Sequence, residues 1–202
     1  MNSSFQLQAV VEAPCFQEEF VCPWDLQIPE PLSWIRLSGE MTDQEIGSIV
    51  AQLVQYNQLD FSGESHMVLD RILNAESLIL PGGLQAVFDD QTIFPSCCCG
   101  LETWREWQAF LTTGNSPWLG HDPSPWVEAK NERVSIWSDG GLGESTQQAF
   151  QIDVSRSTFQ QALQIVEQDL QDFLCSVDSW AQTIGFNQST NLSQKINDCF
   201  DI

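Results

Sequence analysis

Three adjacent cysteines, at positions 97–99, are the most prominent group of potentially reactive side chains in the sequence. Cysteine thiolates act as nucleophiles, redox partners or ligands of soft metals. We predict no metal and no cofactor here, because Cys-x-x-Cys spacing is missing and only His66 and His121 could complete a ligand shell. If the run were a strand, Cys98 would point away from its two neighbours. Packing as small hydrophobic side chains is therefore the favoured interpretation.

Reactivity is the alternative for this run, and Cys99 is the residue predicted to carry it. A helix is expected to begin after Gly100, and its N-terminus would lower the pKa of the Cys99 thiol. His121 could serve as the base if it lay within hydrogen-bond reach of Cys99. No Gly-x-Ser-x-Gly motif and no glycine-rich phosphate loop accompanies these residues, so no catalytic residue is predicted.

A loop rich in glycine and proline, residues 113–126, carries both histidine and tryptophan. Its Asp-Pro pair is typical of turn chemistry, and most tryptophans are expected to pack in the core. A stiff loop with aromatic and acidic side chains would also suit a cationic surface, through anchor residues and cation–π contacts. The candidate binding residues of this region are Trp118, His121, Asp122, Trp126 and Glu128.

Two segments resemble known sequences: PSCCCGLETWREW at 95–107 and PWLGHDPSPWVE at 117–128. They are similar to a set of uncharacterised bacterial proteins with a CCCGLExWxxW segment and an HDPxPWxE loop. The likeness covers roughly residues 95–182. It implies a bacterial cytosolic protein and brings no activity with it.

Across the whole chain, basic residues are scarce. There are 28 acidic and 7 basic residues, for a formal net charge of -21. Solubility of a small domain needs a magnitude of only about 2–8. Such a surface repels nucleic acid and anionic membranes and attracts a basic protein. The last long helix adds four candidate binding residues opposite its apolar stripe, Glu167, Asp169, Asp172 and Asp178.

These features predict a non-enzymatic acidic binding protein, of the immunity or antitoxin type, that inhibits a basic partner such as a toxin. The alternative is an enzyme that uses Cys99 or His121. A nucleic-acid mimic is a further alternative, disfavoured because 28 acidic residues are sparse beside a duplex charge every ~1.7 Å. The start of the chain shows no signal peptide and the cysteine count is odd, so we expect a cytoplasmic protein with seven free thiols. The oligomeric state is left open.

For the architecture, the sequence predicts a single globular domain, 1–202, of the α+β class. An antiparallel sheet would have helices packed on one face, with a long amphipathic helix near the C-terminus. Thr42 and Glu45 form a capping box before one helix, and Ser65 is expected to cap the next. The expected helices are about 42–54, 65–73, 100–111, 158–182 and 192–200. The expected strands are 5–11, 34–37, 78–80 and 84–88 around a turn at 81–83, 92–94, the hairpin 127–130 and 133–137, and 150–154.

Overall fold

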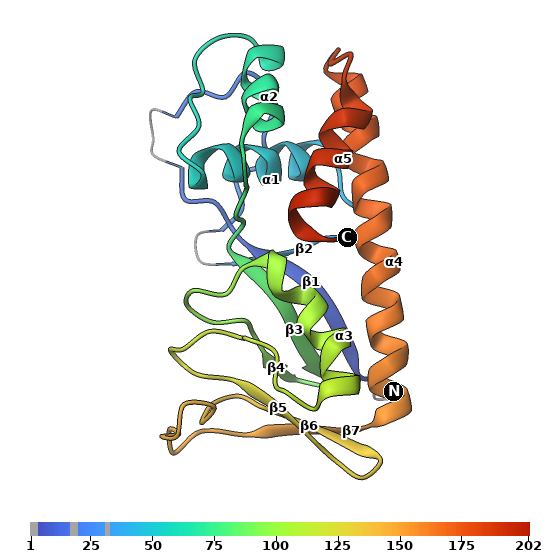
Figure 1. The fold of residues 1–202 in the computed structure, drawn as a ribbon. Coiled ribbons are helices and arrows are strands. Elements are labelled where there is room, and N and C mark those ends of the chain that lie inside the picture. The colour runs from blue at the N-terminus through green and yellow to red at the C-terminus, as the bar shows by residue number, and fades with distance from the viewer. Residues whose placement is uncertain (1–3, 17–19, 31–32) are drawn as a thin grey trace. The chain divides into compact units, whose positions relative to one another are not determined.

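A computed structural model of the chain describes residues 4–16, 20–30 and 33–202. It confirms the α+β class and the long C-terminal helix (Figure 1). The helices are α1 (Asp43–Tyr56), α2 (Ser65–Asn74), the 3₁₀ helix η1 (Leu101–Thr103), α3 (Trp104–Thr113), α4 (Arg156–Thr183) and α5 (Ser189–Phe200). The strands are β1 (Gln6–Glu12), β2 (Trp34–Arg36), β3 (Gly82–Phe88), β4 (Gln91–Ile93), β5 (Trp126–Lys130), β6 (Arg133–Trp137) and β7 (Gln151–Ser155).

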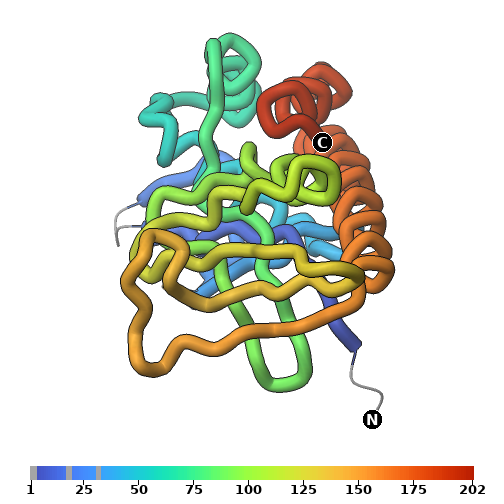
Figure 2. Tube along the Cα trace, turned by 60° about the horizontal axis from the view of Figure 1, so that its bottom comes forward, coloured from blue at the N-terminus to red at the C-terminus, as the bar shows by residue number. Residues whose placement is uncertain are grey.

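The strands form two sheets where the sequence suggested one. The first has four strands in the order β2-β1-β3-β4, and the second has three in the order β5-β6-β7. Figure 2 shows the three strands of the second sheet running side by side. The predicted hairpin is confirmed, since Lys130 pairs with Arg133 across Asn131 and Glu132. Asn131 has a φ of 55°, a left-handed conformation that asparagine adopts more readily than most residues.

The chain divides into two compact units, each assembled from two separate stretches. Unit 1 contains residues 1–10 and 81–168, and unit 2 contains residues 11–80 and 169–202. β1 and α4 each contribute residues to both units. The single-domain organisation stays a prediction.

Unit 1 has an aromatic core around the first part of α4. Phe159 is fully buried, and its ring lies 6.0 Å from that of Trp107 and 5.8 Å from that of Phe110, both on α3. Aromatic pairs at such distances add to the free energy gained from apolar burial. The core therefore fixes α3 against α4, and α3 follows directly from the cysteine run through η1.

Unit 2 contains α1, α2, α5 and the second part of α4. Trp24 and Trp180 meet edge to face at 5.5 Å, and the Trp24 indole N–H donates to the carbonyl of Gly47. The Thr42–Glu45 capping box at the start of α1 is present as predicted. The predicted apolar stripe of α4 is buried along its whole length, from Phe159 to Trp180.

Three local predictions are wrong. Residues 78–80 are not a strand, and Gly82 and Gly83 belong to β3 instead of a turn. Gly82 takes part in β structure because its N–H donates to the carbonyl of Cys99. Ser65 does not cap α2: its hydroxyl donates to the carbonyl of Pro23, and the N-cap residue is Glu64. In the part of the chain that the structure describes, no helix is long and apolar enough to cross a membrane.

Candidate functional site: a thiol–imidazole cluster and an acidic recess

The cysteine run forms a tight turn between β4 and η1. The N–H of Cys99 donates to the carbonyl of Ser96 at 3.1 Å, which closes the turn. Cys98 has a φ of 65°, in the left-handed region. The turn overturns the strand geometry assumed from the sequence, and with it the expectation that Cys98 points away from both neighbours.

A second segment, residues 118–122, is joined to this turn by backbone contacts. The N–H of Ser96 donates to the carbonyl of Leu119 at 2.7 Å, and the indole N–H of Trp118 donates to the carbonyl of Cys98 at 3.0 Å. Gly120, with a φ of 100°, permits the close approach: a Cβ there would lie 2.5 Å from the carbonyl carbon of Ser96. Any other residue at this position would push the two segments apart.

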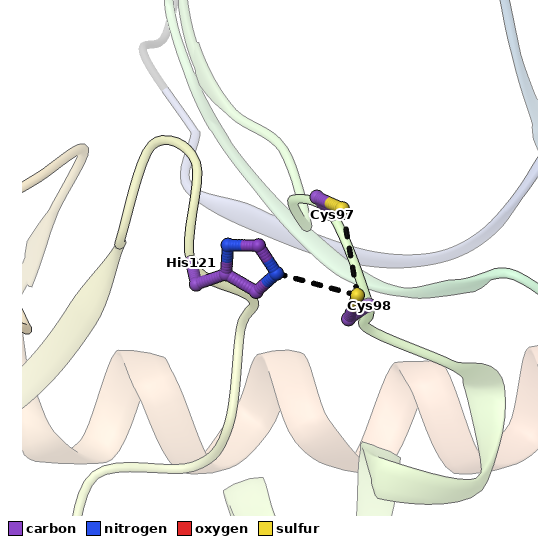
Figure 3. Close-up of side chains that lie close together, drawn as sticks. All are labelled: Cys97, Cys98 and His121. Atoms are coloured by element: carbon purple, nitrogen blue, oxygen red, sulfur yellow. Dashed lines mark hydrogen bonds between the residues drawn. The ribbon is translucent and has the colours of Figure 1, made fainter.

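The thiol site, which we define as Cys97, Cys98 and His121, results from this contact. The Cys98 Sγ lies 3.3 Å from the His121 Nε2 and 3.5 Å from the Cys97 Sγ. Figure 3 shows the His121 ring directed at Cys98 from the neighbouring loop. All three side chains are exposed, and their ligand atoms lie within 4.8 Å of one another. The site can therefore offer two sulfur atoms and one imidazole nitrogen to the same point in space.

Cys99 is excluded from the thiol site. Its side chain is only 8% exposed, and its Sγ contacts the carbonyl of Trp118 and the hydroxyl of Thr103. Burial raises the pKa of the Cys99 thiol to about 11, and the carboxylates of Glu102 and Glu106 reinforce the shift. The sequence-based expectation of a lowered pKa is wrong, because desolvation outweighs any stabilisation by the following short helix. The enzyme alternative required Cys99 within hydrogen-bond reach of His121, but the thiol that lies beside His121 is that of Cys98.

The aromatic binding residues predicted for the loop have different surroundings. Trp118 is 39% exposed, whereas Trp126 is half-buried and stacks on Trp137 with centroids 5.8 Å apart. The Glu128 carboxylate accepts a hydrogen bond from the Trp137 indole. The exposed side chains of Asp122 and Trp118 remain accessible to a partner, while Trp126 and Glu128 support the second sheet.

The acidic residues of α4 already have partners within their own units. Glu167 forms an ion pair with Arg105 in unit 1, and Asp169 forms one with Arg36 in unit 2, each at 2.7 Å. Asp178 accepts hydrogen bonds from Gln182 and Thr190. The helix itself carries no base near these carboxylates, but arginines from other elements supply two.

Unit 2 contains an acidic recess of about 640 Å³ at this part of α4. It includes two of the predicted binding residues, Asp169 and Asp172, beside a third carboxylate from Glu40. Among the described residues that line it, Arg36 is the only basic one. The full lining is Arg36, Ser38, Gly39, Glu40, Asp169, Asp172, Cys175 and Ser176.

A buried carboxylate organises another loop of unit 1. Asp139 accepts hydrogen bonds from the backbone N–H groups of Ser124, Gly140 and Thr146, and from the Ser124 hydroxyl. These donors lower the pKa of Asp139 to about 2. It therefore serves as an anchor that joins residues 138–146 to the end of the tryptophan-bearing loop.

Among the cysteines, the sequence singled out Cys99 and not Cys97 or Cys98, the two that the structure places in the candidate site. The sequence does contain one relevant signal, the Leu-Gly-His segment at 119–121, since a glycine beside a histidine permits a close backbone approach. The partner of that glycine, 24 residues earlier at Ser96, is defined only by the tertiary fold.

Comparison with known proteins adds no relative to this picture. No family model, curated protein or solved structure matches the chain. The candidate sites therefore rest on their geometry and charge.

Proposed function

We propose that this chain is a non-enzymatic acidic binding protein, of the immunity or antitoxin type, that receives a basic protein partner. The observation that carries the proposal is the formal net charge of -21, with 28 acidic and only 7 basic residues. Three of those bases, Arg36, Arg71 and Arg105, are paired with carboxylates of the chain itself. The 21 surplus negative charges repel one another, and relief of this repulsion favours association with a cationic surface.

The acidic recess of unit 2 supports the proposal as a receptor for an arginine or lysine side chain. Its volume of about 640 Å³ has room for such a side chain, and three carboxylates line it against one guanidinium. The Arg36 guanidinium binds Asp169 at 2.7 Å and so holds that carboxylate in place. We expect a partner side chain to contact Glu40, which precedes α1, and Asp172, which lies on α4; both residues line the recess.

The proposal also includes a cytoplasmic location and no binding to nucleic acid or membranes. A protein of this charge repels nucleic acid and anionic lipid, and its cysteines suit the reducing cytoplasm. All seven cysteines are thiols in the structure. Trp118, in unit 1, is the exposed aromatic residue of the predicted loop and remains a candidate anchor for the partner.

An enzyme is the second candidate, and a specific observation keeps it open. Cys98 and His121 are 3.3 Å apart, within the distance at which an imidazole can accept a thiol proton. This pair takes the place of Cys99 and His121. Turnover abolished by Cys98→Ser and retained by Cys99→Ser would support an enzyme that uses this pair.

The binding proposal is tested by affinity capture from a lysate of the source organism with three matched baits. The first is the wild type, and the second is Glu40→Gln/Asp172→Asn, which neutralises the recess. The third is Asp89→Asn/Asp90→Asn, which neutralises the turn between β3 and β4 and changes the net charge equally. We expect the wild type and the turn variant to retain the same basic protein and the recess variant to lose it. Retention of no basic protein, or equal retention by all three baits, would contradict the proposal.

A further inference from the structure

We propose that Cys97, Cys98 and His121 form a binding site for one thiophilic cation, Zn²⁺, with the fourth coordination position open. The site is separate from the acidic recess and does not depend on the proposed partner. Two thiolates and one imidazole make up a ligand set that zinc uses in proteins, and three protein ligands leave room for water or a further group.

The distances between the ligand atoms fit one small tetrahedral ion. With Zn–S of about 2.3 Å and Zn–N of about 2.1 Å, a tetrahedron places two sulfurs ~3.8 Å apart and a sulfur and a nitrogen ~3.6 Å apart. The corresponding separations here are 3.5 Å between the thiols and 3.3 Å between Cys98 and His121. The third separation is within 4.8 Å, so rotation of exposed side chains completes the geometry.

The backbone holds the two ligand-bearing segments together before any ion binds. Ser96 forms two hydrogen bonds with the second segment. Its N–H donates to the carbonyl of Leu119, and its hydroxyl oxygen accepts from the N–H of Asp122 at 3.2 Å. The left-handed conformation of Cys98 places its thiol beside that of Cys97. A preorganised ligand set loses less conformational entropy on binding, which increases affinity.

The chemistry of the ligands selects the class of metal. Sulfur and imidazole ligands favour zinc or monovalent copper, whereas magnesium and calcium require mainly oxygen ligands. The two thiols release their protons to solvent when the ion binds, and the resulting charge of -2 balances Zn²⁺. The exposed carboxylates of Glu102 and Asp122, on the same two segments, add to the favourable potential for a cation.

A competition titration with a chromophoric zinc chelator tests the site in the full-length, reduced protein. We expect one Zn²⁺ per chain, and substitution by Co²⁺ should give the absorption bands of a tetrahedral site with thiolate ligands. Cys98→Ser and His121→Ala should each lower affinity at least about 100-fold, since loss of a group that only supports a ligand already costs about 10- to 100-fold. Cys15→Ser, which removes an exposed thiol outside both candidate sites, is the matched control and should bind as the wild type does.

A second pair of variants separates ligand loss from geometry. Gly120→Ala keeps all three ligands but places a Cβ 2.5 Å from the Ser96 backbone, so it should weaken zinc binding at least about tenfold. Gly47→Ala, in unit 2, also introduces a close contact, 2.6 Å from the Asp25 carbonyl oxygen, and should leave zinc affinity unchanged. The proposal is overturned if wild type and Cys98→Ser bind zinc equally, or if mass spectrometry finds Cys97 and Cys98 joined in a disulfide that excludes the metal.

Discussion

The thiol site of unit 1 and the acidic recess of unit 2 are both candidate sites for a cation, but they are organised in different ways. At the thiol site, contacts between two loops fix the positions of the ligand residues. Ser96, Trp118 and Gly120 hold these loops together and leave the ligand side chains exposed. In the recess, side chains provide the organisation: Arg36 forms an ion pair with Asp169, and the carboxylates of Glu40 and Asp172 lie along the same lining.

This difference matters for how each site would recognise its ligand. Fixed loops with soft ligands suit a single ion of defined geometry. A recess with several carboxylates and one arginine suits a flexible basic side chain, and its contribution depends on ionic strength. One chain thus carries a candidate site defined by coordination geometry and another defined by charge.

The largest expected effect concerns α4, which supports both regions. Phe159→Ala in unit 1 and Phe173→Ala in unit 2 each remove a fully buried ring, so each should lower the free energy of unfolding by about 3–5 kcal/mol. Urea denaturation followed by fluorescence and circular dichroism measures both. If the chain is a single domain, as predicted, both variants shift one shared transition.

A loss below about 0.5 kcal/mol in either variant would show that its stretch of α4 does not stabilise the core. Two separate transitions, one shifted by each variant, would instead show that the units unfold independently.

The sequence predicts features that depend on neighbouring residues better than it predicts features that depend on the tertiary fold. The capping box of Thr42 and Glu45, the hairpin at Asn131 and the stripe of α4 were predictable, because short-range spacing determines each of them. The thiol site was not, because the turn at Cys98 carries no glycine or asparagine signal and is held by a loop 20 or more residues away. The partners of Glu167 and Asp169 were likewise missed, since arginines distant in sequence supply them.

Thiol reactivity gives the next largest effect and compares neighbouring cysteines within unit 1. At pH 8 a thiol with a pKa of about 11 is ionised in only about one molecule in a thousand, and Cys99 is also buried. In metal-free protein, iodoacetamide should therefore alkylate the exposed Cys98 thiol at least about 100-fold faster than the Cys99 thiol. Peptide mass spectrometry over time measures the two rates, with exposed Cys175 as a reference. Equal rates at Cys98 and Cys99 would contradict the burial of Cys99.

A smaller effect is expected from the pH dependence that Asp139 gives to unit 1. The pKa of Asp139 is lowered from 3.8 to about 2 in the folded protein, so its charged form stabilises the fold. This contribution is fully present above the unfolded-state pKa and is lost as the pH falls from about 4 toward 2. The stability difference between wild type and Asp139→Asn should therefore shrink over that range. A difference that stays constant, or grows, as the pH falls would contradict the assigned hydrogen bonds; Asp90→Asn is the control.

Recognition of a basic partner through the acidic recess is tested most directly by an association rate. The rate at which the captured partner binds the protein is measured by stopped flow between 0.01 M and 0.1 M salt. Over this range the screening length shortens from about 30 Å to about 10 Å. We predict that the wild-type association rate falls at least about tenfold as salt rises. At low salt, Glu40→Gln/Asp172→Asn should associate more slowly than the charge-matched Asp89→Asn/Asp90→Asn. An association rate that does not change with salt, or equal rates for the two double variants, would contradict recognition of a basic partner through the acidic recess.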